Sequence, residues 1–294
     1  MSPKTGMNDP ITKIKEKLGG FSKGQKLISG YILEHYEKAS YMTALKLGEA
    51  VGISESTVVR FAIELGFEGY PEMQKSLQAY TKKRSTALQR LEIADNRINK
   101  NNILQSVLNH DISQIRTTLE SADSEQFELA VGKIAGADKI YIFGAMSSGL
   151  LARFLDYYLH LIFDNVILIH AADSSGIKQQ LIRAGSDDTL ICISFPRYSN
   201  SAAETARFAK TKGVGIVAIT DSPVSPLAPL ADCLLLAKSD MASFADSLVA
   251  PLALINALIV AVGMKKRGEI EKVFSELEEI WKQENVYDTG MPPN

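Results

Sequence analysis

The chain has 294 residues, of which 46% are hydrophobic and 22% are charged, with 20 Gly and 10 Pro. This composition is typical of a globular protein with one large or two ordinary domains, and it excludes a disordered, collagen-like or disulfide-scaffold chain. The net charge of −2 hides an asymmetry: residues 1–100 contain 16 Lys and Arg against 11 Asp and Glu, and the remainder contains 16 against 23. Although so few charges also arise by chance, a basic first third is typical of an anion-binding module attached to a separate body.

Helical patterns fill residues 11–82. Ser22 followed by Gln25 is a capping-box signal for a helix start. Apolar residues then recur at helical spacing: Leu27, Ile28, Tyr31 and Ile32. Another helix is expected from Pro71 to the basic cluster at 82–84. After a polar stretch, one more amphipathic helix is predicted from Ile103, Val107, Leu108, Ile112, Ile115 and Leu119, and we interpret it as a connection between domains.

The segment 44–63 has the pattern of a helix-turn-helix. Gly48 is the small residue where two helices cross, and Gly52 suits the positive φ of the turn. The inner faces are formed by Leu47, Val51, Val58 and Phe61, with Ile53 over the turn. Ser54 is placed as the N-cap of the second helix, and Gly66 can close that helix.

The outward side of this second helix is the expected DNA-reading face. In a helix-turn-helix the second helix enters the major groove, where an arginine can reach guanine or phosphate and hydroxyls can contact phosphates or base edges. The candidate DNA-binding residues are Ser54, Glu55, Ser56, Thr57 and Arg60. A plain helical hairpin is the alternative, and the negative charge of Glu55 is unfavourable to DNA.

From about residue 125 onward, short apolar runs alternate with segments long enough for helices. The runs are KIYIFG (139–144), VILIH (166–170), TLICISF (189–195), GIVAIT (215–220) and CLLLA (233–237). Strands that are buried on both faces and alternate with helices predict a doubly wound parallel sheet. Cys192 and Cys233 fall inside these runs and fit a reducing compartment better than a disulfide or a metal site, so we expect neither a metal nor a cofactor.

Polar loops follow the first and third of these strands. In a parallel sheet, the loops at the carboxyl ends of the strands form the ligand crevice. A turn from glycine to serine at a helix N-terminus offers N–H and hydroxyl groups to an oxyanion. The candidate ligand-binding residues in the two loops are Ser147, Ser148, Ser194, Arg197 and Ser199. A purely geometric role for each residue is the alternative, but two such loops on neighbouring strands favour a ligand.

One apolar segment, Leu248 to Met264, must be compared with a membrane span. It is shorter than the roughly 20 residues that cross a bilayer, it contains Pro251 and Asn256, and it ends at a basic cluster, 265–267. We therefore expect a helix that is buried in the core or in a subunit interface. Because residues 1–10 have no apolar signal core, we expect a cytoplasmic protein with no membrane partner.

The segment from Ser54 to Met73 resembles the helix-turn-helix of RpiR-type transcriptional regulators. The matching residues are Ser56, Thr57, Val58, Arg60 and Phe61, followed by Leu65-Gly66-Phe67 and Gly69-Tyr70. The later half is similar to the sugar isomerase (SIS) domain of these regulators at 195–199, at 219–232 and from Pro251 to Asn256. The resemblance covers about residues 11–264. It implies a homodimer or tetramer whose sensor domains bind a phosphorylated sugar or a related metabolite and alter operator affinity.

Two loops depart from the SIS pattern. Met146 stands where the usual first loop has a second glycine, although Ser148 matches its serine. In the second loop only Ser194 and Ser199 match the usual serine-rich pattern. Arg197 replaces part of that loop, where it either supplies charge to the ligand or forms a structural ion pair.

A sugar-phosphate isomerase with a helical accessory domain is the alternative function. Such an enzyme needs a base beside its substrate, and the candidates are Glu204 and His170. Both also suit ordinary structural positions, Glu204 near a helix N-terminus and His170 at a strand end. Because the sequence has no HExxH motif, no Walker A loop and no marked acid–base pair, we expect no enzymatic activity. A DNA-binding protein whose SIS-like half only dimerises is a second alternative.

Together these patterns predict an all-α helix-turn-helix domain joined to an α/β doubly wound parallel-sheet domain of SIS type. We place the DNA-binding domain at residues 1–82, a connecting helical linker at residues 83–121 and the sensing and dimerisation domain at residues 122–294. The predicted partners are double-stranded operator DNA, a small-molecule effector and further copies of the chain. Two paired sensor domains would match half-sites about 34–36 Å apart, or a multiple of that distance.

Overall fold

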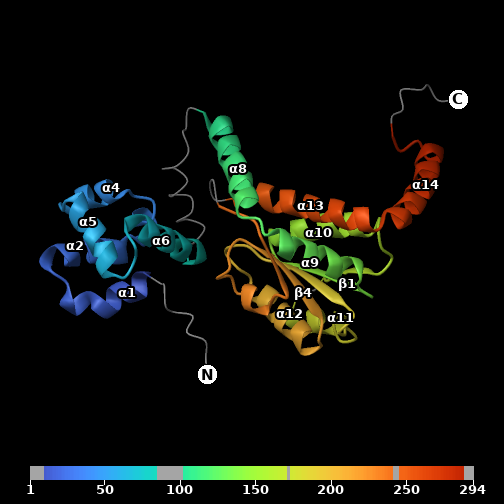
Figure 1. Ribbon diagram of the computed structural model, residues 1–294, viewed down its shortest axis with the longest axis horizontal. Coiled ribbons are helices and arrows are strands. Elements are labelled where there is room, and N and C mark those ends of the chain that lie inside the picture. The colour runs from blue at the N-terminus through green and yellow to red at the C-terminus, as the bar shows by residue number, and fades with distance from the viewer. Residues whose placement is uncertain (1–9, 85–101, 171–172, 241–244, 288–294) are drawn as a thin grey trace. The chain divides into compact units, whose positions relative to one another are not determined.

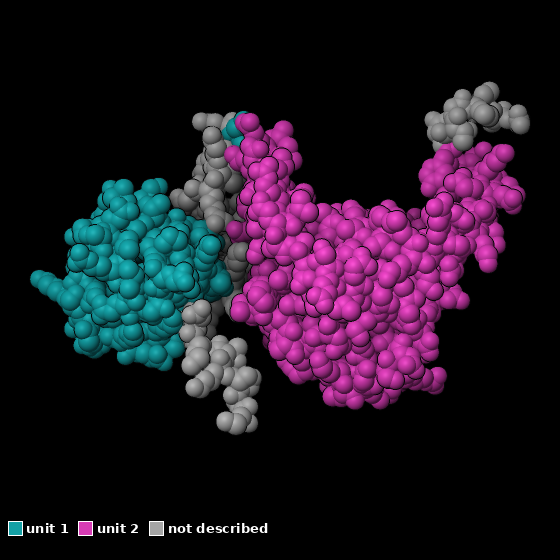
Figure 2. Space-filling model, in the orientation of Figure 1, with its two compact units in different colours: residues 1–102, 242–245 teal, residues 103–241, 246–294 magenta. Residues whose placement is uncertain are grey.

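A computed structural model describes residues 10–84, 102–170, 173–240 and 245–287. The chain divides into two compact units, one formed by residues 1–102 and 242–245 and the other by residues 103–241 and 246–294 (Figure 2). We call them the helical unit and the α/β unit. The expected connecting helix, Ile103–Glu120, belongs to the α/β unit.

The helical unit consists of short helices around one apolar core. Its helices are α1 (Pro10–Lys17), α2 (Lys23–Glu34), α3 (Tyr36–Ala39), α4 (Ala44–Val51), α5 (Glu55–Glu64) and α6 (Tyr70–Arg84), with a 3₁₀ turn at Leu18–Gly20 (Figure 1). The predicted capping box begins α2, where the Ser22 N–H donates to Gln25 Oε1 at 2.8 Å and the Gln25 N–H donates to Ser22 Oγ at 3.4 Å. These two bonds satisfy backbone groups that a helix start leaves free.

The core of this unit contains the inward positions of every helix. Fully buried members are Ile14, Ile28, Ile32, Leu47, Val58, Phe61, Met73 and Leu77. One expected member of the α2 stripe, Leu27, is 49% exposed. Because successive residues of a helix are about 100° apart, a face centred on Ile28 and Ile32 turns Leu27 toward solvent.

The α/β unit contains a parallel sheet of five strands. The strands are β1 (Ile140–Gly144), β2 (Val166–Leu168), β3 (Thr189–Ile193), β4 (Gly215–Thr220) and β5 (Cys233–Leu236). All five predicted runs form strands, although β2 ends before His170 and β3 before Phe195. The spatial order is β2-β1-β3-β4-β5, and Ile140 pairs in register with Val166 on one side and with Thr189 on the other.

Helices cover both faces of the sheet, which confirms the predicted doubly wound architecture (Figure 1). On one face the core includes residues of α9 (Ser124–Ala135), α10 (Ser148–Leu159) and α13 (Val249–Lys265). On the other face it includes residues of α11 (Ser174–Gln180) and α12 (Asn200–Thr211). A short 3₁₀ turn, Ala228–Leu230, precedes β5. Cys192 and Cys233 are free and buried, and burial raises the pKa of the Cys192 thiol to about 12.

Two helices project from the sandwich beside α13. They are α8 (Ile103–Glu120), before α9, and α14 (Arg267–Gln283), which contains Trp281 (Figure 1). The predicted α8 forms, but most of its apolar stripe is exposed, including Leu108 at 52% and Leu119 at 75%. In the part of the chain that the structure covers, no single helix has the length and apolarity of a bilayer span; only α13 and α14 together do, and they meet at a bend of 98°.

Strand order fixes where a ligand crevice lies. The chain leaves β1 for β2 on one side and then crosses to β3 on the other side of β1. The connections after β1 and β3 therefore diverge to opposite faces of the sheet. In doubly wound sheets this switch point opens a crevice outside the carboxyl ends of the strands.

Candidate functional site

The helix-turn-helix is built around two glycines. A Cβ added at Gly48 would lie 2.4 Å from the Ile53 carbonyl oxygen, so only glycine lets the turn approach α4 this closely. Gly52 has φ +70°, the left-handed conformation that glycine adopts without strain. The Ile53 N–H then donates to the Gly48 carbonyl at 2.8 Å. Both predicted glycine roles are confirmed.

The second helix, α5, ends at a well-formed cap. Gly66 has φ +83°, its N–H donates to the Ile63 carbonyl at 2.9 Å, and the Phe67 N–H donates to the Ala62 carbonyl at 3.1 Å. These are the two bonds of a Schellman motif, which satisfies the last carbonyls of a helix. The predicted closing role of Gly66 is therefore confirmed, and α5 keeps a fixed length of Glu55–Glu64.

The five candidate DNA-binding residues lie together at the start of α5. Ser54 occupies the N-cap position, as predicted, but its hydroxyl bonds the hydroxyls of Ser56 (3.1 Å) and Thr57 (2.8 Å) instead of a backbone N–H. Glu55, Ser56 and Arg60 are exposed, and Thr57 is half-buried. The N-terminal turns of α5 thus present three hydroxyls and one guanidinium to the outside. Their contact with DNA stays a prediction.

A cavity of about 640 Å³ lies at the switch point of the sheet. The loop after β1 supplies one wall, the end of β2 and the start of α11 another, and the start of α12 the third. Its polar and charged lining residues are Arg153, His170, Asp173, Ser174, Ser199 and Ser201; its apolar and backbone lining includes Phe143, Gly144, Ala145, Met146, Gly149, Leu150, Leu168, Ile169 and Ile177.

The wall after β1 is a tight turn. A Cβ at Gly144 would lie 2.4 Å from the Ser148 carbonyl oxygen, so the turn requires glycine there. Met146 has φ +55°, a left-handed conformation in a residue with a side chain, and it is 90% exposed. The usual SIS glycine at this position would adopt that conformation without strain, because it lacks a Cβ. Met146 therefore occupies this left-handed position with its side chain exposed to solvent.

The loop after β3 is tied to the loop after β4. The Tyr198 hydroxyl donates to Asp221 Oδ1 at 2.6 Å, and burial, followed by the charge of Asp221, raises the pKa of Tyr198 above its ordinary value. The next residues then reach the cavity, where the hydroxyls of Ser199 and Ser201 lie 2.6 Å apart. The start of α12 is held in place by these contacts.

The far wall is held by an amide side chain. Gln180 brackets the backbone of His170: the His170 N–H donates to Gln180 Oε1 at 3.2 Å, and Gln180 Nε2 donates to the His170 carbonyl at 2.7 Å. Asp173 caps α11 by accepting the Gly176 N–H at 2.7 Å. These bonds fix the main chain at the wall and leave the His170 imidazole exposed.

The predicted ligand-binding residues are only partly gathered here. Ser199 lines the cavity, whereas Ser147 occupies the N-cap position of α10 and Ser148 is buried in its first turn. Ser194 is buried at the end of β3, with its N–H bonded to the Ile219 carbonyl at 3.1 Å, and Arg197 is exposed outside the lining. Their ligand contacts stay predictions.

The largest omission from the sequence interpretation is Arg153. It lies on α10, nine residues after Gly144, and its guanidinium is the cation among the lining residues. A guanidinium matches phosphate and carboxylate groups with two parallel hydrogen bonds. The signal available in the sequence was an arginine one turn into the helix that follows a glycine–serine loop. Ser201 and Asp173 were also missed.

Comparison with known proteins agrees with this arrangement. The helix-turn-helix domain of the rpiR family matches residues 9–84, and the SIS domain matches residues 133–261. The chain therefore joins a helix-turn-helix domain of the rpiR family to a SIS domain.

Two curated HTH-type transcriptional regulators match over most of this chain. An HTH-type transcriptional regulator of Caldanaerobacter subterraneus is 23% identical over 95% of this chain and 99% of its own length, and one of Haemophilus influenzae is 26% identical over 88% and 90%. The sugar isomerase domain of an RpiR transcription factor from Sphaerobacter thermophilus superposes with a TM-score of 0.58 at 26% identity, covering 60% of this chain and 99% of that one. NanR of Vibrio vulnificus, at 20% identity, shares the fold over 93% of this chain and 98% of its own, with a TM-score of 0.55.

Proposed function

We propose that the α/β unit of this RpiR-family regulator senses a phosphorylated sugar, and that binding alters the affinity of the helical unit for operator DNA. The observation that carries the proposal is the cavity of about 640 Å³ at the switch point, with Arg153 in its wall. The cavity lies where doubly wound sheets bind ligands, and its size suits a small metabolite.

The lining chemistry supports an anionic, hydroxyl-rich ligand. Arg153 offers paired N–H donors to a phosphate, and Ser199 and Ser201 offer hydroxyls at the start of α12. The N-termini of α10 and α12 add the positive ends of two helix dipoles at the same edge of the sheet. NanR, which shares the fold, has been solved in complex with ManNAc-6P, a sugar phosphate.

We further propose that the cavity binds its ligand without turnover. Of the two candidate bases, Glu204 is exposed on α12 and is not among the lining residues, whereas His170 is. Asp173, the carboxylate in the wall, already accepts a hydrogen bond as the cap of α11. An isomerase needs a base aimed at the substrate, and neither carboxylate is arranged for that role. His170 does line the cavity, but Gln180 holds only its main chain, and no hydrogen bond among the described residues orients its imidazole.

The proposed regulation is a linkage between two binding events. A ligand shifts the distribution of protein states only as far as it binds one state more tightly than the other. The effect is reciprocal: if a sugar phosphate weakens operator binding tenfold, the operator weakens sugar-phosphate binding tenfold. We propose that the regulator acts as a homo-oligomer, so that two helical units read two half-sites.

The experiment begins with DNA. Purified full-length protein is mixed with sheared genomic DNA at near-physiological salt, and the retained fragments are sequenced. Enrichment of one inverted repeat is expected. Affinity for that repeat should fall by roughly 10³-fold between about 50 and 200 mM salt if about six phosphates are contacted. Absence of any enriched sequence would contradict operator recognition.

The second stage tests the sensor. The genes beside the enriched repeat select a panel of sugar phosphates, which is titrated into the protein with and without operator DNA, with inorganic phosphate as the reference anion. One sugar phosphate is expected to bind and to change operator affinity. Conversion of that compound to an isomer during the titration would instead support the isomerase alternative.

A further inference from the structure

We propose that Ile63, on the outward side of α5, recognises a thymine of the operator by contacting the methyl group of that base. The inference rests on the proposed binding of operator DNA by the helical unit, and it deepens that proposal by naming one base and the residue that selects it. Ile63 is not among the five candidate DNA-binding residues that the sequence predicts.

Ile63 lies in the middle of the outward side of α5. The opposite side of this helix, which includes Val58 and Phe61, is buried in the core of the helical unit. Because successive helix residues are about 100° apart, Ile63 points in nearly the same direction as Ser56, seven residues earlier. Arg60 lies between them on the same side, and all three side chains are exposed. At about 1.5 Å of rise per residue, this side is about 10 Å long, which matches about three base steps of DNA.

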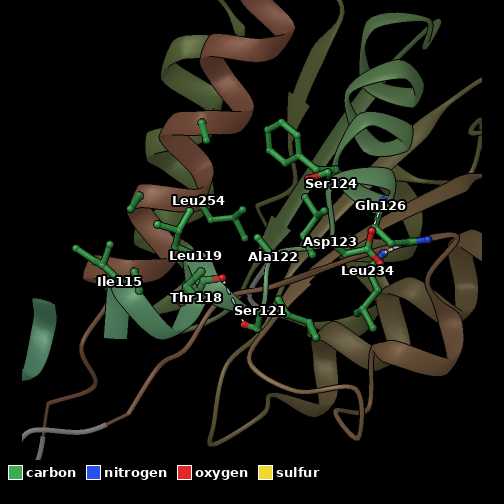
Figure 3. Close-up of a pocket in the computed structure, with 16 residues that line it drawn as sticks. Ile115, Thr118, Leu119, Ser121, Ala122, Asp123, Ser124, Gln126, Leu234 and Leu254 are labelled. Carbon is green, nitrogen blue, oxygen red and sulfur yellow. Dashed lines mark hydrogen bonds between the residues drawn. The ribbon is translucent and has the colours of Figure 1, made fainter. Parts of the chain in front are cut away.

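The exposed apolar surface of α5 is small. Ile63 is 53% exposed, and the half-buried Val59 lies one turn before it. The α/β unit differs, because several exposed apolar side chains follow one another along α8, and at its end Ile115 and Leu119 line a cavity of about 690 Å³ together with Leu254 (Figure 3). An extended apolar surface is typical of a site that binds another molecule over a wide apolar contact. The small apolar surface at Ile63 suits a polar partner that carries single apolar groups.

The side chain is the group that Ile63 offers to DNA. Its N–H lies inside α5, where each backbone N–H bonds the carbonyl four residues earlier. Its carbonyl accepts the Gly66 N–H at 2.9 Å in the Schellman motif. The side chain is β-branched, so it keeps one strongly preferred rotamer in a helix and presents a fixed apolar shape. Ile63 can therefore recognise an apolar group, but it cannot recognise the hydrogen-bonding pattern of a base.

Thymine presents the apolar group that such a side chain can recognise. In the major groove the other three bases offer hydrogen-bond donors and acceptors, whereas thymine offers an acceptor and its C5-methyl group. Residues three apart on a helix have Cβ atoms about 5–6 Å apart, so Arg60 and Ile63 reach neighbouring positions on DNA. The thymine should therefore lie within about one or two base pairs of the base or phosphate that Arg60 contacts.

The charges around Ile63 are compatible with a polyanion. The carboxylate of the adjacent Glu64 accepts a hydrogen bond from the Gln25 amide, and the Glu64 carbonyl accepts one from Lys17 Nζ at 2.6 Å. These contacts hold the acidic residue toward α1 and α2, and they bring a positive charge to the end of α5. Arg60 places another positive charge one turn before Ile63. Both charges attract phosphate groups, so DNA can approach the apolar side chain.

The test removes the methyl group from the DNA and the isoleucine from the protein. Each thymine of the operator half-site is replaced in turn by uracil, which differs from thymine only in lacking the methyl group. Full-length wild type, Ile63→Ala and Ile63→Val are titrated with each duplex at fixed salt. The matched control is Leu27→Ala, since Leu27 is similarly exposed but lies on α2. Circular dichroism verifies that each variant is folded.

The proposal expects one thymine at which the methyl group matters. Uracil at that position should lower the affinity of the wild type by roughly 3- to 10-fold per half-site, because one buried methyl contact is lost. Ile63→Ala should bind the thymine duplex more weakly by a similar factor and should bind the two duplexes equally, because its contact is already absent. Ile63→Val should lose less affinity. Leu27→Ala should discriminate between the duplexes as the wild type does.

Two results would overturn the proposal. One is an equal loss of affinity with uracil for wild type and Ile63→Ala, which would show that the methyl group contacts another residue. The other is a wild-type affinity that uracil leaves unchanged at every thymine of the half-site. In both cases the operator is still bound specifically, so failure of this contact is separable from failure of the proposed function, in which the wild type binds no specific sequence and both proposals fall.

Discussion

Replacement of Gly48 by alanine sets two opposing effects against each other. Gly48 lies inside α4, where alanine is more favourable than glycine by about 1 kcal/mol. The added Cβ, however, would lie 2.4 Å from the Ile53 carbonyl oxygen. Relieving such an overlap costs about 1–3 kcal/mol, and displacement of Ile53 also weakens the 2.8 Å bond from its N–H to the Gly48 carbonyl by about 1 kcal/mol. The net expectation is destabilisation of the helical unit by about 1–3 kcal/mol.

The measurement is thermal unfolding of the full-length protein, followed by far-ultraviolet circular dichroism. In a unit of this size, about 1–3 kcal/mol corresponds to a fall in Tm of about 5 to 20 °C. The matched control is Gly30→Ala, in the interior of α2, where an added Cβ meets nothing within 4 Å. At position 30 only the higher helix propensity of alanine over glycine acts, so Tm should rise. If Gly48→Ala raises Tm as Gly30→Ala does, the close crossing of α4 and the turn is wrong.

Three further predictions concern single side chains. Arg60→Ala should lower operator affinity by roughly 5- to 150-fold in a binding titration at fixed salt, and unchanged affinity would remove Arg60 from the reading face. Arg153→Ala should lower effector affinity, measured by calorimetry, by roughly 10- to 150-fold, whereas Arg197→Ala should lower it by less than about 5-fold. A larger loss for Arg197→Ala than for Arg153→Ala would show that Arg197 binds the anionic group of the ligand. Burial raises the pKa of Tyr70, whose hydroxyl donates to the Met42 carbonyl at 2.8 Å. Above about pH 10 the unfolded chain loses this proton and the folded chain keeps it, so stability should fall as pH rises beyond that value. Urea titrations between about pH 8 and 11 should show a smaller fall for Tyr70→Phe, and an equal fall would show that other groups cause it.

The parts of the fold that the sequence predicts well are those set by local chemistry. Gly48, Gly52 and Gly66 were identified because a close crossing, a turn and a helix end each require an absent side chain. The capping box at Ser22 depends on residues three apart. The strands were identified because a strand that is buried on both faces is continuously apolar. The observed strands differ from the predicted runs only in where they begin and end.

The ligand cavity was harder to predict because it depends on strand order. The two expected loops do lie beside β1 and β3, and Ser199 reaches the cavity. Arg153, on the second turn of α10, and Ser201, in the first turn of α12, were missed, because a helix residue is recognisable as part of a cavity lining only once the direction of that helix is known. Periodicity likewise predicted the apolar stripe of α8, but it could not show that the stripe faces away from its own chain, as with Leu119.

The position of Trp281 determines what spectroscopy of the native protein can report. It is the single tryptophan of the sequence, it lies on α14, and its ring contacts those of Phe274 and Tyr287 at centroid distances of 6.3 and 5.2 Å. Tryptophan emission therefore originates from the α/β unit alone and reports the unfolding of that unit. When tryptophan emission is recorded together with far-ultraviolet circular dichroism, unfolding of the α/β unit can be distinguished from unfolding of the helical unit without an added label.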